Sequence, residues 1–543
     1  MAASHPSSGP GSAPRAGPHA ATPRTQGTPA RPGAWAALTG LVAAFAGVLA
    51  GELVAAFASP SLSPVTAVGG AVVDFAPPAA KDWAVAVFGT GDKAFLVASI
   101  GILLALLGAA AGVAELRRPG VGVALAGAIG AVGLAAVATR ALATPGAWAC
   151  ALAAGAVAMA LVRWLVGRLR REAQAGPPAS GPPVRGALPR RGFLRALTGT
   201  AAAVALGGAV AAVVRAAAVR ATAARDALRL PAPAGPAEAV PAGADLGVPG
   251  VAPLVTPNPD FYRIDTALVV PSVEPAGWTL TVTGLVERPL TLTWDELLAQ
   301  PLVARHVTLA CVSNPVGGDL VGNALWLGWP VRELLARAGP LPGADMVLSR
   351  SVDGFTASTP LEALTDPGRD ALLAVGMNGE PLPPEHGFPA RLVVPGLYGF
   401  VSATKWVSEL KVTTFAEDLA YWSTRGWSER GPIKTASRID TPRQGARVAA
   451  GTVAVGGVAW AQHRGITAVE LRVDDGAWQP ARLGAGISTD TWYQWASEVK
   501  LDPGTHRITV RAADETGAFQ TDRTAPPAPD GATGHHTITI EAT

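Results

Sequence analysis

The chain is poor in the residues that bind metals or form disulfides. It contains two cysteines, Cys150 and Cys311, and eight histidines among 543 residues. Two cysteines exclude a disulfide framework, a cysteine-rich zinc site and an iron–sulfur cluster held by cysteines. The net charge is only +3 and the lysines and arginines are thinly spread, which is not typical of a nucleic-acid-binding surface. We therefore expect no nucleic-acid partner.

Long apolar runs are confined to the first 220 residues, where alanine, glycine, valine and leucine dominate. Residues 1–33 have a composition typical of disorder. Five apolar stretches follow, each long enough to cross a bilayer, at residues 34–58, 93–115, 119–139, 146–167 and 194–218. The sequence thus predicts an all-α transmembrane domain of five helices over residues 34–218.

These five stretches contain no histidine. A haem within a membrane normally needs His, Met or Cys ligands, and only Met159 and Cys150 are available there. We therefore expect no haem, and expect the helices to anchor or dock the protein. Glu52 is the one clear carboxylate inside a predicted span, and either a functional role or a helix–helix hydrogen bond would explain it.

Arginines predict the orientation, because cytoplasmic loops of membrane proteins are rich in basic residues. They crowd the N-terminus, the loop after the second stretch and the long loop before the fifth, whereas the opposite loops carry only Lys81, Lys93 and Arg140. We expect a multi-pass protein of the cell membrane, with a cytoplasmic N-terminus and everything after the fifth helix outside. "PRRGFLRALTG" (189–199) resembles a twin-arginine export signal, although an ordinary positive flank also explains its arginines.

After residue 218 the composition becomes that of an ordinary globular protein. Residues 219–257 are rich in proline and alanine and are expected to form a linker. Residues 258–430 mix short strands with a few helices, whereas only strand patterns occur over 431–543. The spacing of those strands and a "DDG" hairpin signal predict a β-sandwich of the immunoglobulin type.

Local signals predict several elements of the 258–430 region. "LTWDELLA" (292–299) predicts a helix with Thr293 as its N-cap and Glu296 completing a capping box. "RHVTLAC" (305–311) predicts a strand that ends at Cys311. Further predictions are a strand at 277–286, a helix at 331–339 closed by Gly339 and a buried strand within 391–399.

Three separated blocks carry a family resemblance. They read "HVTLACVSNPVGGDLVGNALWLGWPVRELL", "AVGMNGEPLPPEHGFPARLVVPGLYGFVSATKWV" and "DDGAWQPARL…TWYQW". In this order they resemble the sulfite oxidase family of molybdenum enzymes over about residues 250–543. The resemblance implies an α+β molybdopterin-binding domain followed by an immunoglobulin-like domain, which in many members forms a homodimer. The five membrane helices are not part of the general family pattern.

The resemblance gives Cys311 a role. Members of the family hold molybdenum through the dithiolene sulfurs of a pyranopterin and one protein thiolate, so Cys311 is the implied metal ligand and catalytic residue. Soft sulfur donors suit a metal that changes oxidation state. Without the surrounding blocks, a lone cysteine would more often be an inert buried side chain.

The resemblance also implies how the pterin is bound, because its phosphate needs positive charge and hydrogen-bond donors. The implied cofactor-binding residues are Tyr262, Arg263, Cys311, Asp353, His386, Arg391, Ala403, Thr404 and Lys405. Around Tyr262 and Arg263, sulfite oxidases have an arginine–asparagine–histidine run. This chain reads "RID" there, which is closer to the bacterial branch that reduces methionine sulfoxide.

The segments expected near the substrate carry little positive charge. In sulfite oxidases an arginine follows shortly after the metal-binding cysteine, whereas "VSNPVGGDL" follows Cys311 here. Trp427 stands near the place of a tyrosine usual in the sulfite pocket, and Trp326 is expected to line the pocket. Cations that could compensate are Arg425, Arg430 and Lys434. The sequence therefore favours reduction of a neutral S-oxide or N-oxide over sulfite oxidation.

We interpret the chain as a membrane-anchored molybdenum oxidoreductase that acts on a small molecule outside the cytoplasmic membrane. Since it has no candidate haem domain, a quinone or a separate redox protein would exchange electrons with it. One alternative is a receptor or scaffold with a decayed enzyme domain, against which the joint retention of Cys311, His386, Arg391 and Lys405 argues. Another is a transporter, which the odd helix number and few intramembrane polar groups disfavour.

Overall fold

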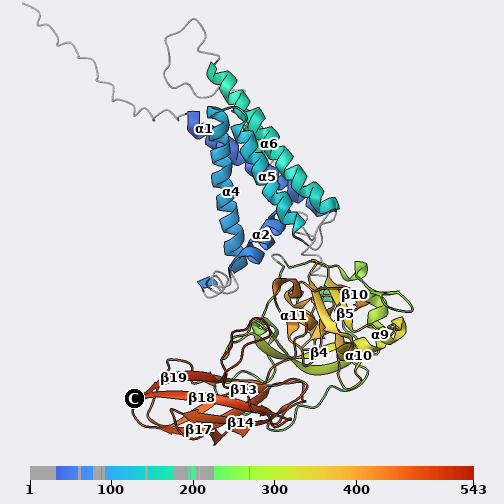
Figure 1. The fold of residues 1–543 in the computed structure, drawn as a ribbon, viewed down its shortest axis with the longest axis vertical. Helices are drawn as coiled ribbons and strands as arrows, with labels where there is room; N and C mark the ends of the chain where they lie inside the picture. The colour runs from blue at the N-terminus through green and yellow to red at the C-terminus, as the bar shows by residue number, and fades with distance from the viewer. Residues whose placement is uncertain are drawn as a thin grey trace, which may run out of the picture.

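The computed structural model describes residues 32–58, 63–77, 83, 87–88, 92–140, 145–174, 194–195, 197–202, 207, 225–267 and 270–543. Three parts follow one another along the chain in Figure 1: a bundle of apolar helices, an α+β domain and a β-sandwich. This order confirms the predicted fold class.

Four helices of the bundle are long and apolar enough to cross a membrane. They are α1 (Pro32–Ala58), α4 (Asp92–Arg117), α5 (Val121–Ala138) and α6 (Pro145–Gln174). Glycines let α1 and α4 approach closely: a Cβ atom on Gly40 would lie 2.0 Å from the carbonyl oxygen of Gly108. Four of the five predicted stretches therefore form such helices. The fifth, at 194–218, lies mostly outside the described residues, as does the arginine pair of the proposed export signal.

A short helix that the sequence analysis missed, α2 (Pro64–Phe75), lies at the end of the bundle next to the α+β domain (Figure 1). Ser63 and Thr66 form a capping box at its start. A carboxylate oxygen of Glu52 accepts a hydrogen bond from Val65 N at 3.3 Å. Glu52 thus makes a helix–helix hydrogen bond, which is one of the two explanations left open above.

The α+β domain contains two sheets. The first has the order β2-β1-β10-β5-β6, with β1 (Thr279–Gly284), β2 (Leu290–Thr293), β5 (Met346–Ser351), β6 (Thr356–Pro360) and β10 (Val407–Thr413). The second has the order β3-β4-β7-β8, with β3 (Val303–Ala310), β4 (Val321–Pro330), β7 (Leu372–Met377), β8 (Glu380–Pro381) and β9 (Arg391–Val393) paired to β7. Trp278, Trp294 and Trp329 are buried in their common core.

Short helices complete the α+β domain, and local signals predicted two of them. In α8 (Trp294–Leu298), Thr293 and Glu296 form the predicted capping box. The predicted helix α9 (Val331–Ala338) ends at Gly339, whose φ of +68° favours glycine. The others are α10 (Leu361–Thr365), α11 (Gly399–Ser402) and the 3₁₀ turns η2 (Asn258–Asp260), η3 (Pro275–Gly277), η4 (Pro384–His386) and η5 (Ser423–Arg425).

Beyond residue 435 the described elements are all strands, which form two facing sheets. One has the order β11-β13-β17-β16, with β11 (Ala436–Thr441), β13 (Gly451–Trp460), β16 (Arg482–Leu483) and β17 (Tyr493–Leu501). The other has the order β12-β19-β18-β14-β15, with β12 (Arg447–Val448), β14 (Ile466–Val473), β15 (Gln479–Pro480), β18 (Gly504–Asp514) and β19 (His536–Ala542). Trp495 is fully buried between them.

Candidate active site

A pocket with a cavity volume of about 100 Å³ lies in the α+β domain, where irregular segments distant in sequence meet. Seven of the nine predicted cofactor-binding residues line it: Tyr262, Cys311, Asp353, His386, Arg391, Ala403 and Lys405. They come from the segment after η2, the end of β3, the β5–β6 turn, η4, β9 and the segment after α11. Two of the three sequence blocks that carry the resemblance, those containing Cys311 and His386, therefore meet at this pocket, whereas the third lies in the β-sandwich.

Cys311 directly follows β3 at the start of the loop that returns to β4. Its backbone N donates to Leu320 O at 2.9 Å, which joins the two ends of the loop. Its carbonyl accepts from Asn314 N at 3.1 Å, which forms a turn at the start of the loop. The side chain is only 8% exposed. Burial raises the pKa of the Cys311 thiol, while hydrogen bonds from Ser313 oppose this. A metal cation bound to the sulfur would lower the pKa of such a thiol and favour the thiolate.

Arg391 is a buried cation without an acidic partner among the described residues. Its guanidinium donates to the carbonyls of His386 at 3.0 Å and Ala403 at 3.4 Å, and lies 5.0 Å from the ring centroid of Trp326. Burial lowers the pKa of Arg391 to about 10, so it remains charged at neutral pH. A buried charge of this kind is stabilised by a bound anion. The phosphate of a pyranopterin fits this requirement.

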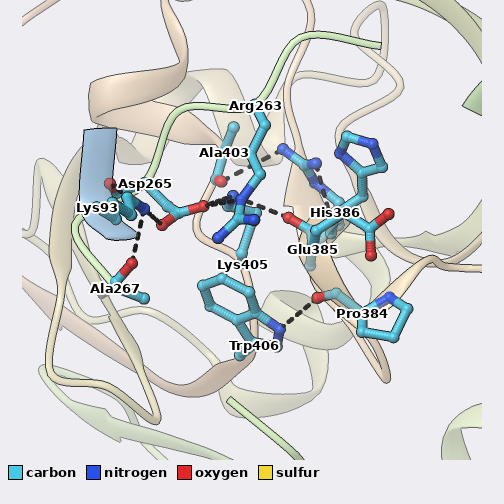
Figure 2. Close-up of polar contacts among 11 residues, drawn as sticks. Lys93, Arg263, Asp265, Ala267, Pro384, Glu385, His386, Ala403, Lys405 and Trp406 are labelled. Carbon is cyan, nitrogen blue, oxygen red and sulfur yellow. Dashed lines mark hydrogen bonds and ion pairs between the residues drawn. The ribbon is translucent and has the colours of Figure 1, made fainter. Parts of the chain in front are cut away.

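Lys405 lines the pocket and belongs to a cluster in which three cations surround Asp265 (Figure 2). Its Nζ is 2.8 Å from Asp265 Oδ2 and 3.0 Å from Glu385 O. Burial lowers the pKa of Lys405 to about 8, and the nearby Asp265 carboxylate opposes this effect. Asp265 is in turn surrounded by cations: burial would raise the pKa of its carboxyl, but Lys405, Lys93 and Arg263 together bring it far below its usual value.

Burial shifts the pKa of three further residues of the pocket. Burial, together with Arg391 and Lys405, lowers the pKa of His386 to about 3, so its ring is neutral at neutral pH. Its Nε2 lies 3.3 Å from Asn258 O, which as an acceptor favours a hydrogen on this nitrogen. Burial also raises the pKa of Tyr262 and of Asp353. His386 thus offers a fixed hydrogen-bonding ring, not a proton-transfer group.

Two predicted residues lie beside the pocket without lining it. Arg263 donates through Nε to Asp265 at 2.9 Å. Thr404 is fully buried, and its hydroxyl shares a 2.7 Å hydrogen bond with that of Ser349. One expectation is wrong: Trp326 is buried behind Arg391 instead of lining the pocket, because its indole donates to Val307 O and packs edge-on against Phe261.

Sequence reasoning missed Asp265 and Lys93, which meet in this site. Lys93 Nζ, at the start of α4, lies 2.6 Å from Asp265 Oδ1, although the two residues are 172 positions apart. Asp265 had a weak signal, since it stands two residues after Arg263. Lys93 had none, because nothing in its local sequence indicates a partner in another part of the protein.

The lining also includes five aromatic side chains outside the predicted set and the 261–267 segment: Phe355, Phe400, Trp406, Trp422 and Trp427. Polar residues such as Ser313 and Ser351 line it as well. Trp427 therefore lies where expected. The three cations that could have compensated for a missing arginine are engaged elsewhere and do not line the pocket. Arg425 pairs with Asp74 at 3.1 Å, Lys434 pairs with Asp530 at 2.8 Å, and Arg430 lies 4.5 Å from the ring centroid of Phe415.

Comparison with known proteins identifies the family of the chain. Residues 267–422 match the oxidoreductase molybdopterin binding domain, and residues 436–510 match a bacterial Ig domain. The chain is 29% identical over 322 residues to mitochondrial sulfite oxidase of Homo sapiens, covering 50% of this chain and 58% of the human protein. It is 30% identical over 320 residues to sulfite oxidase of Gallus gallus, with 50% and 69% covered.

Two further similarities are shorter or looser. Over 178 residues the chain is 35% identical to nitrate reductase [NADH] 1 of Oryza sativa subsp. japonica, covering 28% of this chain and 19% of that protein. The solved structure of the sulfane dehydrogenase SoxCD from Paracoccus pantotrophus matches with 25% identity and a TM-score of 0.48, covering 54% of this chain and 82% of that one. The chain spans little more than half of the human relative, but more than two thirds of the chicken one. The chain belongs to the sulfite oxidase family of molybdopterin-dependent oxidoreductases.

Proposed function

We propose that this protein is a membrane-anchored molybdenum enzyme that reduces neutral S-oxides or N-oxides on the outer side of the cytoplasmic membrane. One observation carries the choice of substrate: several aromatic side chains line the pocket around Cys311, its two cations Arg391 and Lys405 are assigned to the pterin, and Arg425 and Lys434 pair with carboxylates outside it. A quinone or a separate redox protein would supply the two electrons, and the C-terminal sandwich would form a homodimer.

The residues of the pocket divide into two groups. Cys311 would bind the metal, and Arg391, His386 and Lys405 would hold the pterin phosphate and its neighbouring polar groups. The molybdenum cofactor, when bound, supplies oxygen-atom transfer coupled to a two-electron change. Trp422 and Trp427 would exclude water and orient a small neutral substrate beside Cys311.

Charge is the property that distinguishes the substrates. Relatives of this chain are named sulfite oxidase and nitrate reductase, and sulfite and nitrate are both anions. Recognition of such an anion favours an arginine that can donate two parallel hydrogen bonds. In this pocket Arg391 already donates to carbonyls on the side assigned to the pterin, and Arg425 is held by Asp74. A neutral oxide needs no such partner.

Steady-state kinetics of the full-length protein tests the proposal. Methionine sulfoxide and trimethylamine N-oxide would be assayed with a reduced dye, sulfite with an artificial acceptor, and nitrate with the same reduced dye. A missing charge-assisted contact costs about 2–3 kcal/mol, so we expect kcat/KM for a neutral oxide to exceed that for either anion about 100-fold. Efficient sulfite oxidation at micromolar substrate would overturn the substrate assignment.

Two controls sharpen this test. Lys434→Gln removes a cation that pairs with Asp530 outside the pocket, so kcat/KM for all four substrates should stay unchanged. A large loss would mean that the outlying cations do contribute. Metal analysis of the wild-type protein addresses the alternative class of function, because a receptor with a decayed enzyme domain would contain no molybdenum.

A further inference from the structure

Two sets of polar contacts join the helix bundle to the α+β domain. In the first, Asp74 of α2 accepts hydrogen bonds from the Tyr421 hydroxyl and from Arg425, and also pairs with Arg140 at the end of α5. In the second, Lys93 of α4 contacts Asp265 and the carbonyl of Ala267. Among the described residues, the second set is the one that directly contacts a residue lining the pocket, Asp265.

Lys93 donates hydrogen bonds to the side chain of Asp265 and to the main chain of Ala267. Its Nζ lies 2.6 Å from Asp265 Oδ1 and 2.7 Å from Ala267 O. Figure 2 shows Lys93 entering from α4 on one side of Asp265, while Lys405 and Arg263 approach the carboxylate from the other. Asp265 is 4% exposed and Lys93 28% exposed, so this ion pair is largely shielded from solvent.

The segment that Lys93 holds forms one side of the pocket. Residues 261–267 contain neither helix nor strand, yet Phe261, Tyr262, Ile264, Asp265 and Thr266 all line the cavity. An irregular segment lacks the repeated backbone hydrogen bonds of a sheet, so its position depends on individual side-chain contacts. Lys93 provides two such contacts from outside the α+β domain.

The charge balance explains why a third cation is useful at Asp265. The carboxylate pairs with Lys405 at 2.8 Å and with Arg263 at 2.9 Å. Lys405 is also the residue assigned to the pterin phosphate, so a bound cofactor would draw its ammonium away from Asp265. Lys93 and Arg263 would then still neutralise a nearly buried carboxylate, which would otherwise be costly to keep ionised.

We propose that Lys93 is a positioning residue that acts through Asp265: it holds residues 261–267 against the pocket, so that retention of the molybdenum cofactor depends on the membrane bundle. This inference rests on the proposed function in that the pocket holds the cofactor. The bundle is then part of the cofactor site as well as a membrane anchor.

Two measurements on the full-length protein in detergent test this role. The first is molybdenum per protein during dialysis, by mass spectrometry of the metal. Loss of a supporting residue typically lowers metal affinity about 10–100-fold, so we expect Lys93→Met to lose molybdenum about tenfold faster than wild type. The second is trypsin cleavage after Arg263, an exposed residue inside the held segment, which we expect to accelerate by a similar factor.

Three variants separate positioning from a general structural effect. Lys93→Arg keeps the charge and should retain molybdenum as the wild type does. Asp265→Asn removes the same ion pair and also releases Lys405 and Arg263, so it should lose molybdenum at least as fast as Lys93→Met. The double variant should lose it more slowly than the product of the two single effects predicts, because the two substitutions share the contact between Lys93 and Asp265. Asp74→Asn breaks the other contact between the same two parts, so it should retain molybdenum and resist trypsin after Arg263.

The outcomes are distinguishable from those of the proposed function. Wild-type rates for Lys93→Met in both measurements would overturn the inference. Equal losses in Asp74→Asn would also overturn it, because docking in general would then be responsible. Absence of molybdenum from the wild-type protein would refute the proposed function, while the trypsin measurement would still test the contact between Lys93 and Asp265.

Discussion

At the scale of single residues, Cys311 illustrates how one rare side chain can define a site. A cysteine surrounded by apolar strands is usually inert, but Cys311 opens into a pocket that it shares with two buried cations. Burial raises the pKa of the thiol, so the free protein would hold it protonated. A metal that supplies positive charge at the sulfur would reverse this preference.

This view leads to a prediction for Cys311→Ser. Serine has a similar volume but offers a hard, poorly ionised oxygen in place of a soft thiolate. Residues that merely support ligands are worth 10–100-fold, so we expect loss of the ligand itself to lower turnover by more than about 100-fold. Far-UV circular dichroism and Tm should stay close to wild type. Near-normal turnover would end the assignment of Cys311 as the metal ligand.

The residues that sequence could predict are those inside contiguous family blocks. Cys311, His386, Arg391 and Lys405 stand in such blocks, and all four line one pocket. The direction of a side chain was less predictable. Trp326 lies on the central strand β4 of its sheet and turns into the core, where Arg391 covers it. Contacts between distant segments, such as Lys93 with Asp265, leave no local pattern at all.

At the scale of elements, helix ends were predicted because their signals are local. The capping box at Thr293 and the glycine after α9 are each contained within a few residues. Strand order could not be predicted, since β1 pairs with β10 across more than 100 residues. Helix α2 was missed because it is too short to span a bilayer and too apolar to be recognised as a surface helix.

The loop that carries Cys311 depends on a neighbouring element of the sandwich. Gly317 has a φ of +77°, and a Cβ atom there would lie 2.2 Å from the ring of His536. That ring cannot move freely, because its Nδ1 accepts a hydrogen bond from Ile439 N at 2.9 Å. The β-sandwich therefore packs directly against the loop that positions the proposed metal ligand.

Gly317→Ala should consequently destabilise the protein and weaken molybdenum binding. An alanine in the left-handed region costs about 1–2 kcal/mol by itself, and the contact with His536 adds to this. Gly343→Ala is the matched control: its φ is +92° but no atom lies within 4 Å of its Cβ. We expect Tm and molybdenum content to fall further for Gly317→Ala than for Gly343→Ala. Equal effects would show that the sandwich does not support the loop.

At the scale of the whole molecule, hydrogen bonds join the α+β domain to the β-sandwich and to residues 219–257. Gln462 of the sandwich donates to Thr308 O at 2.9 Å, in the strand that leads to Cys311. The region predicted as a linker also packs closely: Trp492 donates to Leu254 O at 2.8 Å and Ala234 N donates to Leu302 O at 2.7 Å. The described part of residues 219–257 therefore packs against both the α+β domain and the β-sandwich.

The contacts of the bundle bear on its orientation in the membrane. Asp74 and Arg140, together with Lys93, lie at the helix ends that face the α+β domain. These are the ends that the sequence assigns to the outer side, because the arginine-rich loops lie at the opposite ends. The position of the α+β domain at this end of the bundle is therefore consistent with the orientation that the arginines predict.

We predict that protease added to intact spheroplasts removes residues 220–543 and leaves the helices before them protected. The physical reason is the cost of moving arginine-rich loops across the membrane, which fixes the helices in one orientation. A tag at the C-terminus and a tag at the N-terminus, followed by immunoblotting, would report the two sides. Loss of the N-terminal tag together with protection of the C-terminal tag would reverse the topology.

The same assay distinguishes the two explanations for the arginines before the fifth predicted helix. Replacing both Arg190 and Arg191 by lysine keeps the positive charge, so an ordinary positive flank would still orient the helix. A twin-arginine signal, in contrast, is read by a receptor and should not tolerate the exchange. We expect the double variant to keep residues 220–543 inside the cell, protected from protease. Normal cleavage would exclude the export signal while leaving the orientation argument intact.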